Sequence, residues 1–359
     1  MSRVILVLFF FLSCRNIGTI GFGLAPSAIL SRRPWRSAHL PTSTRWDHAL
    51  MLADFWPKGK GQSNEAKERC PVLICPAQLS VPGDYKQMVV EFKKRGHAAY
   101  CADLTRFGWI AGLVPSAFSL EYFNGELTPG KTLKFYYEAI DRTMQEIREK
   151  HPGQGVHVVG HSIGGWVSRS WLAEGCSPEV RDNVLSLTTL GTPNTGPPED
   201  AGGPWTAVDQ TRGLLKNLND RFPGAHLENV RYTSVAGTAL EGKFPGSVEE
   251  MLAFISYLPL CGNGNARGDG IIPIDVATLE GSTVVELHSS KHSGKSPSSP
   301  KSRRFVPFPG DAIDLGPDFL WYGSPSLMGE WVENLEAAER QRGKVGRRAA
   351  GGKSGGWSW

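Results

Sequence analysis

The stretch VHVVGHSIGGWVSRSWLAEG, residues 156–175, decides the fold. Four mostly apolar residues, 156–159, run directly into the pentapeptide GHSIG at 160–164, and apolar residues then recur with a helical period. No polar loop separates the two segments, so a buried strand ends on Ser162 at the point where a helix begins. A hydroxyl in that position, with a glycine on either side, needs an explanation other than packing.

The pattern G-x-S-x-G between a strand and a helix predicts a sharp turn called a nucleophile elbow. Side chains two residues before and two residues after the serine would clash in such a turn, so Gly160 and Gly164 occupy those places and His161 directly precedes the serine. The turn holds Ser162 Oγ above the edge of the sheet, open to a substrate. The N–H of Ile163 lies at the N-terminus of the next helix, where it can donate to an oxyanion.

Strand-like and helix-like segments alternate on both sides of this turn. The strand-like runs are 71–77, 97–104, 156–162, 184–194, 230–237 and 283–288, and the helical ones are 84–96, 131–151, 163–175 and 326–341. Such alternation predicts an α/β domain with a mostly parallel central sheet and helices on both faces. We expect at least six strands in one domain that covers residues 70–341.

Two segments interrupt this alternation after the carboxyl ends of strands, where α/β sheets place their sites. Residues 105–130 are expected to form a long aromatic loop, and residues 195–229 contain Gly/Pro-rich turns and a predicted helix at 205–220. Both are interpreted as lid-like insertions. Four side chains of the first could bind an apolar substrate, although ordinary packing explains them equally well: Trp109, Leu113, Phe118 and Tyr122.

Two further segments are expected to lack fixed structure. Residues 291–318 begin with a basic, Ser/Pro-rich run and are predicted to be a flexible insertion. Residues 342–359 are rich in glycine and basic residues and are predicted to be a disordered tail.

A serine hydroxyl is a weak nucleophile and needs a base that is held by an acid. In a sheet with this elbow the chain order is Ser, acid, His, so the base must follow residue 162. Three histidines do so: His226, His288 and His292. His292 follows the last strand by a short loop and is the expected base, His288 at the end of that strand remains the alternative, and His226 is poorly placed in the insertion.

The expected acid is Asp269, which lies between two glycines before the apolar run Ile-Ile-Pro. A short loop of this kind can fix a carboxylate at the edge of the sheet. The competing interpretation is a simple Asp-Gly turn.

The second oxyanion donor is expected from the loop after the first strand, CPAQLSVPGDY, as the backbone N–H of Gln78 or, as the alternative, Leu79. This chemistry needs no cofactor, and none is expected. No metal is expected either, because the histidines at 288 and 292 have no third ligand near them in the sequence. The five cysteines after Cys14 form no CxxC pair and do not indicate a disulfide framework.

Charge is unevenly distributed along the 359 residues. The chain has 39 basic and 35 acidic residues, and residues 1–46 hold six arginines and no acidic residue. The other 33 basic and 35 acidic residues nearly balance, so no nucleic-acid partner is expected.

Residues 1–46 are interpreted as a leader. The apolar run Val4–Leu12 is too short to span a bilayer and is typical of a secretory signal. The following Arg- and Ser/Thr-rich stretch is typical of a transit peptide. We therefore expect delivery to a plastid through the secretory route, with secretion or the endomembrane lumen as the alternative.

The motifs GHSIGG, LGTPN, YTSVAG and GDGIIP, followed by a late histidine, resemble the lipase/esterase branch of the α/β-hydrolase superfamily over about residues 70–340. CPAQLSVPGDY, GWIAGLVPS, GHSIGGWVSRSWLAE and WYGSP are more similar to a group of plastid-targeted plant and algal α/β-hydrolases. In that group a His-Ser pair shortly precedes Trp-Tyr-Gly-Ser, which supports His292 as the base. This chain departs from the pattern in two ways: a basic insertion separates the two motifs, and Pro76-Ala77 stands where many relatives have His-Gly.

The resemblance implies an α/β-hydrolase fold. With the residues above it predicts a serine hydrolase that cleaves carboxylic esters through an acyl-enzyme. The expected substrate is a small-molecule or lipid ester with an apolar acyl group, and any membrane contact would be peripheral. An acyltransferase or thioesterase with the same residues, and a non-catalytic binding protein on the same fold, remain open. The oligomeric state is not predicted.

Overall fold

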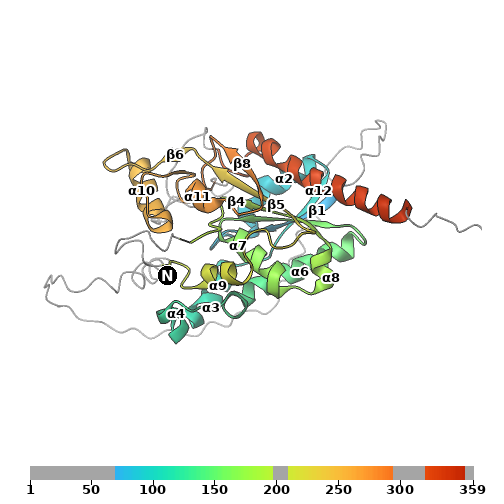
Figure 1. Ribbon diagram of the computed structural model, residues 1–359, viewed down its shortest axis with the longest axis horizontal. Coiled ribbons are helices and arrows are strands. Elements are labelled where there is room, and N and C mark those ends of the chain that lie inside the picture. Colours follow the sequence, from blue (N-terminus) through green and yellow to red (C-terminus); the bar gives the residue numbers. More distant parts are fainter. Residues whose placement is uncertain (1–68, 197–208, 294–319, 352–359) are drawn as a thin grey trace, which may run out of the picture. The chain divides into compact units, whose positions relative to one another are not determined.

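The computed structural model describes residues 69–196, 209–293 and 320–351. Its centre is a six-stranded parallel sheet (Figure 1). The strand order is β2-β1-β3-β4-β5-β8, and every neighbouring pair is parallel. The strands are β1 (Arg69–Cys75), β2 (His97–Cys101), β3 (Val156–His161), β4 (Val184–Leu190), β5 (Arg231–Gly237) and β8 (Thr283–Leu287). The predicted fold class is therefore confirmed, and the six strands fall in the six predicted places.

Helices cover both faces of the sheet. In Figure 1, α2 and α12 lie above it, and α6, α7 and α8 lie below it. The helical segments between β1 and β4 are η1 (Pro82–Tyr85), α2 (Lys86–Lys94), α3 (Arg106–Ala117), α4 (Leu120–Asn124), α5 (Pro129–Thr132), α6 (Lys134–Lys150), α7 (Ile163–Ser170), the π-helical turn η2 (Trp171–Gly175) and α8 (Pro178–Asp182). The later ones are α9 (Leu214–Arg221), α10 (Val248–Cys261), α11 (Ile274–Ala277) and α12 (Pro325–Gly351).

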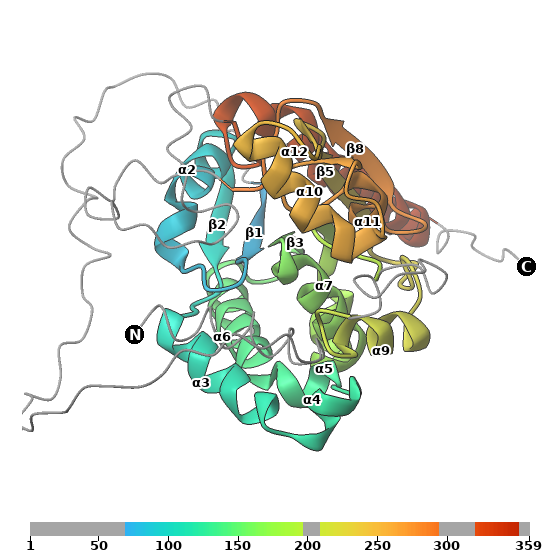
Figure 2. The same ribbon diagram turned by 90° about the vertical axis from the view of Figure 1, so that its left-hand side faces the viewer.

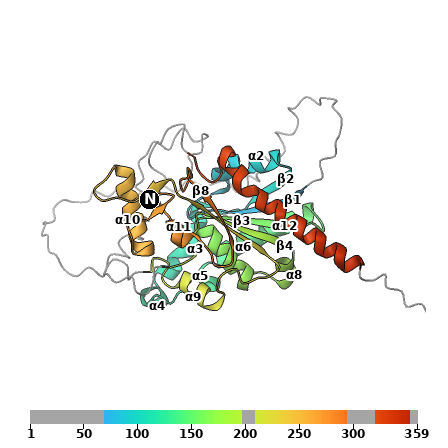
Figure 3. The ribbon, with the colours of Figure 1, turned by 45° about the horizontal axis from the view of Figure 1, so that its top comes forward.

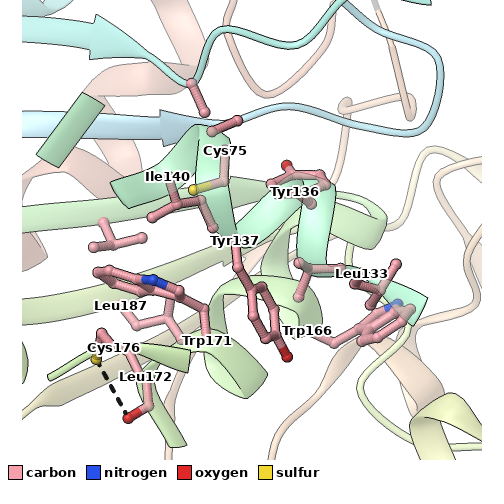
Figure 4. Close-up of a cluster of buried hydrophobic side chains, with 14 of the residues drawn as sticks. Cys75, Leu133, Tyr136, Tyr137, Ile140, Trp166, Trp171, Leu172, Cys176 and Leu187 are labelled. Carbon is pink, nitrogen blue, oxygen red and sulfur yellow. Dashed lines mark hydrogen bonds between the residues drawn. The ribbon is translucent and has the colours of Figure 1, made fainter. Parts of the chain in front are cut away.

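Alternating side chains of each strand pack against the two helical layers, because successive residues of a strand point to opposite faces. Val72 and Ile74 of β1 belong to the core that contains residues of α2 and α12. Leu73 and Cys75 of the same strand belong to the larger core under α6 and α7. Figure 4 shows part of that second core, in which Cys75, Tyr136, Tyr137, Trp166 and Trp171 gather. Burial on both faces explains why the strands read as nearly continuous apolar runs.

Hydrogen bonds attach α12 to the end of the sheet at which the strands begin. Glu339 Oε1 accepts from the backbone N–H of Cys70 at 3.0 Å and pairs with His157 Nε2 at 3.2 Å. Cys70 and His157 are each the second residue of their strands, β1 and β3. Figure 3 shows α12 running across this face of the sheet beside α2.

The segment predicted as an aromatic loop is helical instead. Residues 105–130 contain α3, α4 and the start of α5, and Figure 2 places α3 beside α6 and α4 next to α3. The Thr105 side chain accepts from the N–H of Gly108 at 2.9 Å, and the Ser119 side chain accepts from the N–H of Tyr122 at 3.2 Å. These capping bonds fix the two helix starts, and the glycine and proline content of the segment had hidden them.

Two predicted boundaries also change. The closing helix continues to Gly351, ten residues past the predicted end, because Lys, Arg and Ala favour a helix and no proline follows. The residues 342–351 are therefore not disordered as predicted. The helix predicted at 205–220 is α9, Leu214–Arg221, which begins directly after Gly213 at a φ of +98°.

Other features lie outside the predictions. The two-stranded sheet of β6 (Leu240–Glu241) and β7 (Arg267–Gly268), and the helix α10 between them, were not predicted. The leader 1–46, residues 294–318 of the predicted flexible insertion and residues 352–359 of the tail lie outside the described residues. All described residues belong to one compact unit. Among the described helices, none combines the length and apolar character that crossing a membrane requires.

Candidate active site

The turn at Ser162 is strained in the way that an elbow requires. β3 ends at His161, α7 begins at Ile163, and Ser162 between them has φ 54° and ψ −129°. A positive φ in a residue other than glycine costs about 1–3 kcal/mol, so the surroundings must hold it. They do so with two backbone hydrogen bonds, from Ser162 N–H to Leu190 O at 2.9 Å and from Gly165 N–H to Ser162 O at 3.0 Å.

The two glycines of the pentapeptide are required by close approach of the backbone. A Cβ on Gly160 would lie 2.6 Å from the carbonyl oxygen of Gly164, and a Cβ on Gly164 would lie 2.7 Å from the carbonyl oxygen of Pro76. Real Cβ atoms do not come so near, so any side chain there would displace the turn or the end of β1. Ser162 itself is half-buried.

Asp269 and His292, which are far apart in the sequence, form a bonded pair. His292 Nδ1 and Asp269 Oδ2 are 2.7 Å apart, and the backbone N–H of His292 donates to the carbonyl oxygen of Asp269 at 3.0 Å. An ionised carboxylate only accepts, so Nδ1 carries a proton. When the ring is neutral, the other nitrogen, Nε2, is the unprotonated one, which is the form that a general base needs.

The Asp269 carboxylate has no exposed side-chain surface. Its Oδ1 accepts from the N–H groups of Ile271 at 3.0 Å and Ile272 at 2.7 Å. Burial acts to raise the pKa of Asp269, but the charge of His292 and the hydrogen bonds from His292 and the two isoleucine amides outweigh it, so the pKa lies below its usual range. The group is thus ionised at neutral pH.

Tyr322 also contacts this carboxylate, a role that the sequence did not predict. Its hydroxyl donates to Asp269 Oδ2 at 2.7 Å and accepts from the N–H of Gly237 at 2.8 Å. The signal was present in the WYGSP motif, which was used only for the resemblance. A tyrosine that returns to the sheet after a long insertion has no local pattern that would reveal its partner.

His161 connects this pair to the elbow. Its Nε2 lies 2.7 Å from the backbone oxygen of His292, and the two rings are 5.1 Å apart. The structure therefore brings His292 and Asp269 beside the residue that precedes Ser162. Among the described residues, neither Ser162 Oγ nor His292 Nε2 has a hydrogen-bond partner.

The other two histidines lie elsewhere. His288 is exposed, and its Nδ1 pairs with the hydroxyl of Thr238 at 3.1 Å. The ring of His226 contacts Phe222 and Tyr232, with ring centroids 5.4 Å and 6.3 Å apart. Neither is bonded to a carboxylate in the described part of the chain, in contrast to His292.

The loop after β1 forms a turn in which Ser80 N–H donates to Ala77 O at 3.0 Å. Leu79 has a positive φ of 59°, and Gln78 is exposed. The N–H of Ala77 donates to the Tyr85 hydroxyl at 2.7 Å. The amides of Gln78 and Ile163 meet no acceptor among the described residues, so both are available to a ligand.

The four side chains predicted to bind substrate divide into two pairs. Trp109 is completely buried and packs edge-on against Phe135 and Tyr136, so it is a core residue and not part of an open cleft. Tyr122 is 7% exposed and lies under the guanidinium of Arg212. For Trp109 the packing explanation fits, because the core takes up the whole ring, and its part in substrate binding stays a prediction. Leu113 is half-buried against the same core, and Phe118 is 70% exposed.

One group of metal-ligand type occurs among the described residues, although no metal was expected. The ligand atoms of Cys70, His157 and Glu339 lie within 4.8 Å of one another. Hydrogen bonds within the group account for its arrangement, and it lies at the end of the sheet opposite to Ser162.

Comparisons with known proteins point to the same fold. A family model described as alpha/beta hydrolase fold matches residues 123–259. Lipase 2 of Staphylococcus aureus (strain MRSA252) is 24% identical over 252 residues, which are 54% of this chain and 36% of the lipase. A lipase of Staphylococcus epidermidis is 29% identical over 140 residues, 32% of this chain and 20% of the lipase. The chain thus spans about a third or less of the length of these relatives.

Two solved structures are also similar to the chain. The Bacillus licheniformis lipase BlEst2 in mature form aligns with a TM-score of 0.41 and 18% identity, covering 63% of this chain and 86% of that one. The metagenomic carboxyl esterase MGS0156 aligns with a TM-score of 0.39 and 13% identity, covering 68% and 74%.

The sheet order, the elbow and the family match define the class: this chain has the α/β-hydrolase fold. The curated proteins that it matches are named lipases.

Proposed function

We propose that this protein is a serine hydrolase that cleaves carboxylic esters through an acyl-enzyme on Ser162. The observation that carries the proposal is the 2.7 Å bond between the buried Asp269 carboxylate and His292 Nδ1, beside the strained turn at Ser162. A structural turn would not need an ionised, fully buried acid that holds an imidazole next to an accessible hydroxyl.

The mechanism follows from these positions. His292 Nε2 accepts the proton as Ser162 Oγ attacks the ester carbonyl, and Asp269 stabilises the imidazolium that forms. A carboxylate in this role is worth up to ~10⁴ in kcat. His292 then returns the proton to the leaving alcohol, and a water molecule repeats the sequence to release the acid and free Ser162.

The oxyanion of each tetrahedral intermediate needs donors that are already in place. The amides of Ile163 and Gln78 are the proposed pair, because neither has an acceptor among the described residues. Each such donor is worth about 2.7–4 kcal/mol in the transition state. The absence of a hydrogen bond on Ser162 Oγ in the described structure fits this account, since catalytic hydrogen bonds often tighten only when substrate is bound.

We propose an apolar acyl ester as the substrate class, met at a lipid surface by peripheral contact. The support is the segment of α3 and α4, where large apolar side chains face solvent. Their exposed fractions are 76% for Phe107, 70% for Phe118, 78% for Leu120 and 58% for Phe123. We define these four side chains as the α3–α4 apolar patch.

We further propose that residues 1–46 deliver the protein to a plastid through the secretory route. The support is the sequence of a short apolar run followed by an Arg- and Ser/Thr-rich stretch. A fluorescent protein fused behind these residues is expected in the plastid of an alga with a secondary plastid. Its appearance in the medium or the endoplasmic reticulum would favour the secreted alternative.

The test of the catalytic proposal is covalent labelling with a fluorophosphonate, which reacts with activated serines. We expect one label on the wild type, none on Ser162→Ala, and full labelling of Ser289→Ala, a control at an exposed serine. Labelling that persists in Ser162→Ala would reject the proposal, and so would a wild type that neither labels nor turns over esters.

A panel of acyl donors then distinguishes the open alternatives. Nitrophenyl esters of increasing chain length test the apolar preference, and matched thioesters test for a thioesterase. An alcohol added to the reaction tests for an acyltransferase, which would form ester faster than free acid.

A further inference from the structure

His161 is the most enclosed polar side chain at the elbow. It is 3% exposed, and its ring packs against Tyr85, Trp321 and Tyr322 with centroids 5.9, 5.7 and 6.0 Å away. A residue that served only to fill this space would be apolar. The proposed reaction uses Ser162 and leaves the side chain of His161 without a stated role.

Both ring nitrogens of His161 are nonetheless paired. Nε2 lies 2.7 Å from the backbone oxygen of His292, and Nδ1 lies 2.8 Å from the hydroxyl of Tyr85. The Tyr85 oxygen in turn accepts from the N–H of Ala77 at 2.7 Å. Three hydrogen bonds therefore run without a break from Ala77 to His292.

The direction of each bond can be assigned. Burial, followed by the charge of His292, lowers the pKa of His161 to about 3, so the ring is neutral at pH 7 and carries one proton. A carbonyl oxygen can only accept, so that proton is on Nε2 and donates to His292 O. Nδ1 must then accept from the Tyr85 hydroxyl, whose oxygen accepts from Ala77. Every donor and acceptor in the series is satisfied in one way only.

The two ends of the series are the two loops that flank the elbow. Ala77 directly precedes Gln78, the proposed oxyanion donor, in the loop after β1. His292 is the proposed base in the loop after β8, and its backbone is held on both sides, by Asp269 through the N–H and by His161 through the carbonyl.

We propose that Tyr85 and His161 are positioning residues whose hydrogen bonds fix the oxyanion donor and the base relative to each other across Ser162. We call this series of bonds the Tyr85–His161 link. The inference rests on the proposed function and deepens it, because it makes a single buried connection responsible for the placement of two groups that act in the same step.

Catalytic groups must be held close to their productive geometry, and a misplacement of about 1 Å can cost ~10² in rate. A broken link would leave the core filled but let the two loops move independently. The loss should then fall on kcat, since neither Tyr85 nor His161 touches the substrate in this account.

Tyr85→Phe is the cleanest variant, because it removes one hydroxyl and keeps the buried ring. We expect kcat for a soluble nitrophenyl ester to fall by roughly 10- to 100-fold with little change in KM. Rates are taken per active site counted by fluorophosphonate, so that misfolded protein is excluded. Tyr137→Phe is the matched control: it also removes a buried hydroxyl, which bonds to Ser170 Oγ at 2.7 Å, and should keep the wild-type kcat.

A second pair of variants tests whether the two residues act as one. His161→Gln keeps a donor that can reach the carbonyl of His292 and should retain more of kcat than His161→Leu. In the double variant Tyr85→Phe with His161→Leu, the two losses should not multiply, because either change alone breaks the link. Multiplying losses, or a Tyr85→Phe enzyme that turns over like Tyr137→Phe, would overturn the inference.

Nuclear magnetic resonance separates this inference from the proposed function. In the wild type at pH 6–8 the His161 ring should be protonated on Nε2 alone, and Tyr85→Phe should shift the amide resonances of both Gln78 and His292. If the wild type proves inactive, the proposed function fails, and the two amide shifts in Tyr85→Phe still test whether the Tyr85–His161 link exists. A His292 amide resonance that does not shift in Tyr85→Phe would contradict the Tyr85–His161 link even in an active enzyme.

Discussion

Burial has opposite outcomes for two side chains that lie close together at this site. Asp269 keeps its charge inside the protein because its carboxylate accepts from His292, Tyr322 and the amides of Ile271 and Ile272. His161 is neutral because burial, followed by the charge of His292, lowers its pKa, and its hydrogen bond to the His292 carbonyl opposes this only in part. The number of available donors, and not the depth of burial alone, decides which form is stable.

The neutral state of His161 predicts a specific dependence of stability on pH. Its pKa is lowered to about 3 in the folded protein, and the unfolded value is near 6.5. Below pH 6.5 the unfolded state therefore binds a proton that the folded state does not, so stability falls as the pH decreases from 6.5 toward 3. Between pH 7 and pH 5 this linkage costs the wild type roughly 2 kcal/mol.

His161→Gln removes the titrating group and with it this part of the slope. The measurement is urea unfolding of both proteins at pH 7 and pH 5. The variant is expected to be the less stable protein at pH 7 and to recover roughly 2 kcal/mol relative to the wild type at pH 5. An unchanged difference between the two proteins would show that His161 is protonated, or is free to become so, in the folded state.

Single residues differ in how far their partners can be predicted. The glycines around Ser162 and the glycines around Asp269 give local signals, and the chain order of acid and histidine follows from the elbow. The structure brings Asp269 and His292 together, although their catalytic roles stay a prediction until tested. Tyr322 and Tyr85 had no such signal, because their hydroxyls meet partners 53 and 76 residues away in the sequence.

At the level of elements, the segment 105–130 shows where periodicity fails. Its helix α3 contains glycine and proline, α4 has only 5 residues, and both expose apolar side chains, so no clear polar face marks them as helices. The capping side chains Thr105 and Ser119 were visible in the sequence, but caps alone do not reveal a helix. Trp109 shows the same limit, because the sequence does not distinguish an aromatic residue of the core from one that binds a ligand.

The α3–α4 apolar patch carries a prediction of its own. Replacement of Phe118 and Phe123 by serine should weaken binding to phospholipid vesicles several-fold, because each change removes apolar area that would be buried at the lipid surface. Hydrolysis of a soluble short-chain ester should stay close to wild type. Vesicle sedimentation and a soluble-ester assay on the same preparations measure the two effects.

Val90→Ser provides the control for that experiment. Val90 is also exposed, at 49%, but lies on α2, which covers the other face of the sheet. Its loss should not change vesicle binding. Equal weakening by both changes would mean that the chain meets lipid through general apolar character, and the patch would have no special part in it.

For the whole molecule, the parallel sheet was predictable, and several of the elements around it were not. The central strands are buried on both faces and leave apolar runs, and all six strands fall in the predicted places. The two-stranded sheet of β6 and β7 and the helix α10 were missed, because strands of two residues carry no period and α10 contains Pro259. The end of α12 was misjudged because residues 342–351 contain three glycines, which in a sequence indicate the end of a helix.

Trp331 on α12 links the packing of the whole domain to the site. It is fully buried, meets Phe92 edge-on at 5.8 Å, and donates from Nε1 to the backbone oxygen of Tyr322 at 3.0 Å. Trp331→Ala should lower the free energy of unfolding by about 3–5 kcal/mol, through lost burial and the cavity that remains. Chemical unfolding measures this loss.

Trp331→Phe is the companion variant, since it keeps most of the ring but not the N–H. It should retain more of the stability than alanine while still releasing the carbonyl of Tyr322. If alanine and phenylalanine were equally tolerated with no loss of stability, α12 would not be docked as described.

A parallel sheet sends all its strand ends to one edge and all its strand beginnings to the other. In this domain Ser162, Asp269 and His292 lie at the end where the strands finish, whereas the contacts of Glu339 with His157 and Cys70 attach α12 at the end where they begin. The two edges can therefore be altered separately. Substitutions at the end of the sheet where the strands begin can therefore change thermal stability without altering the residues at the other end.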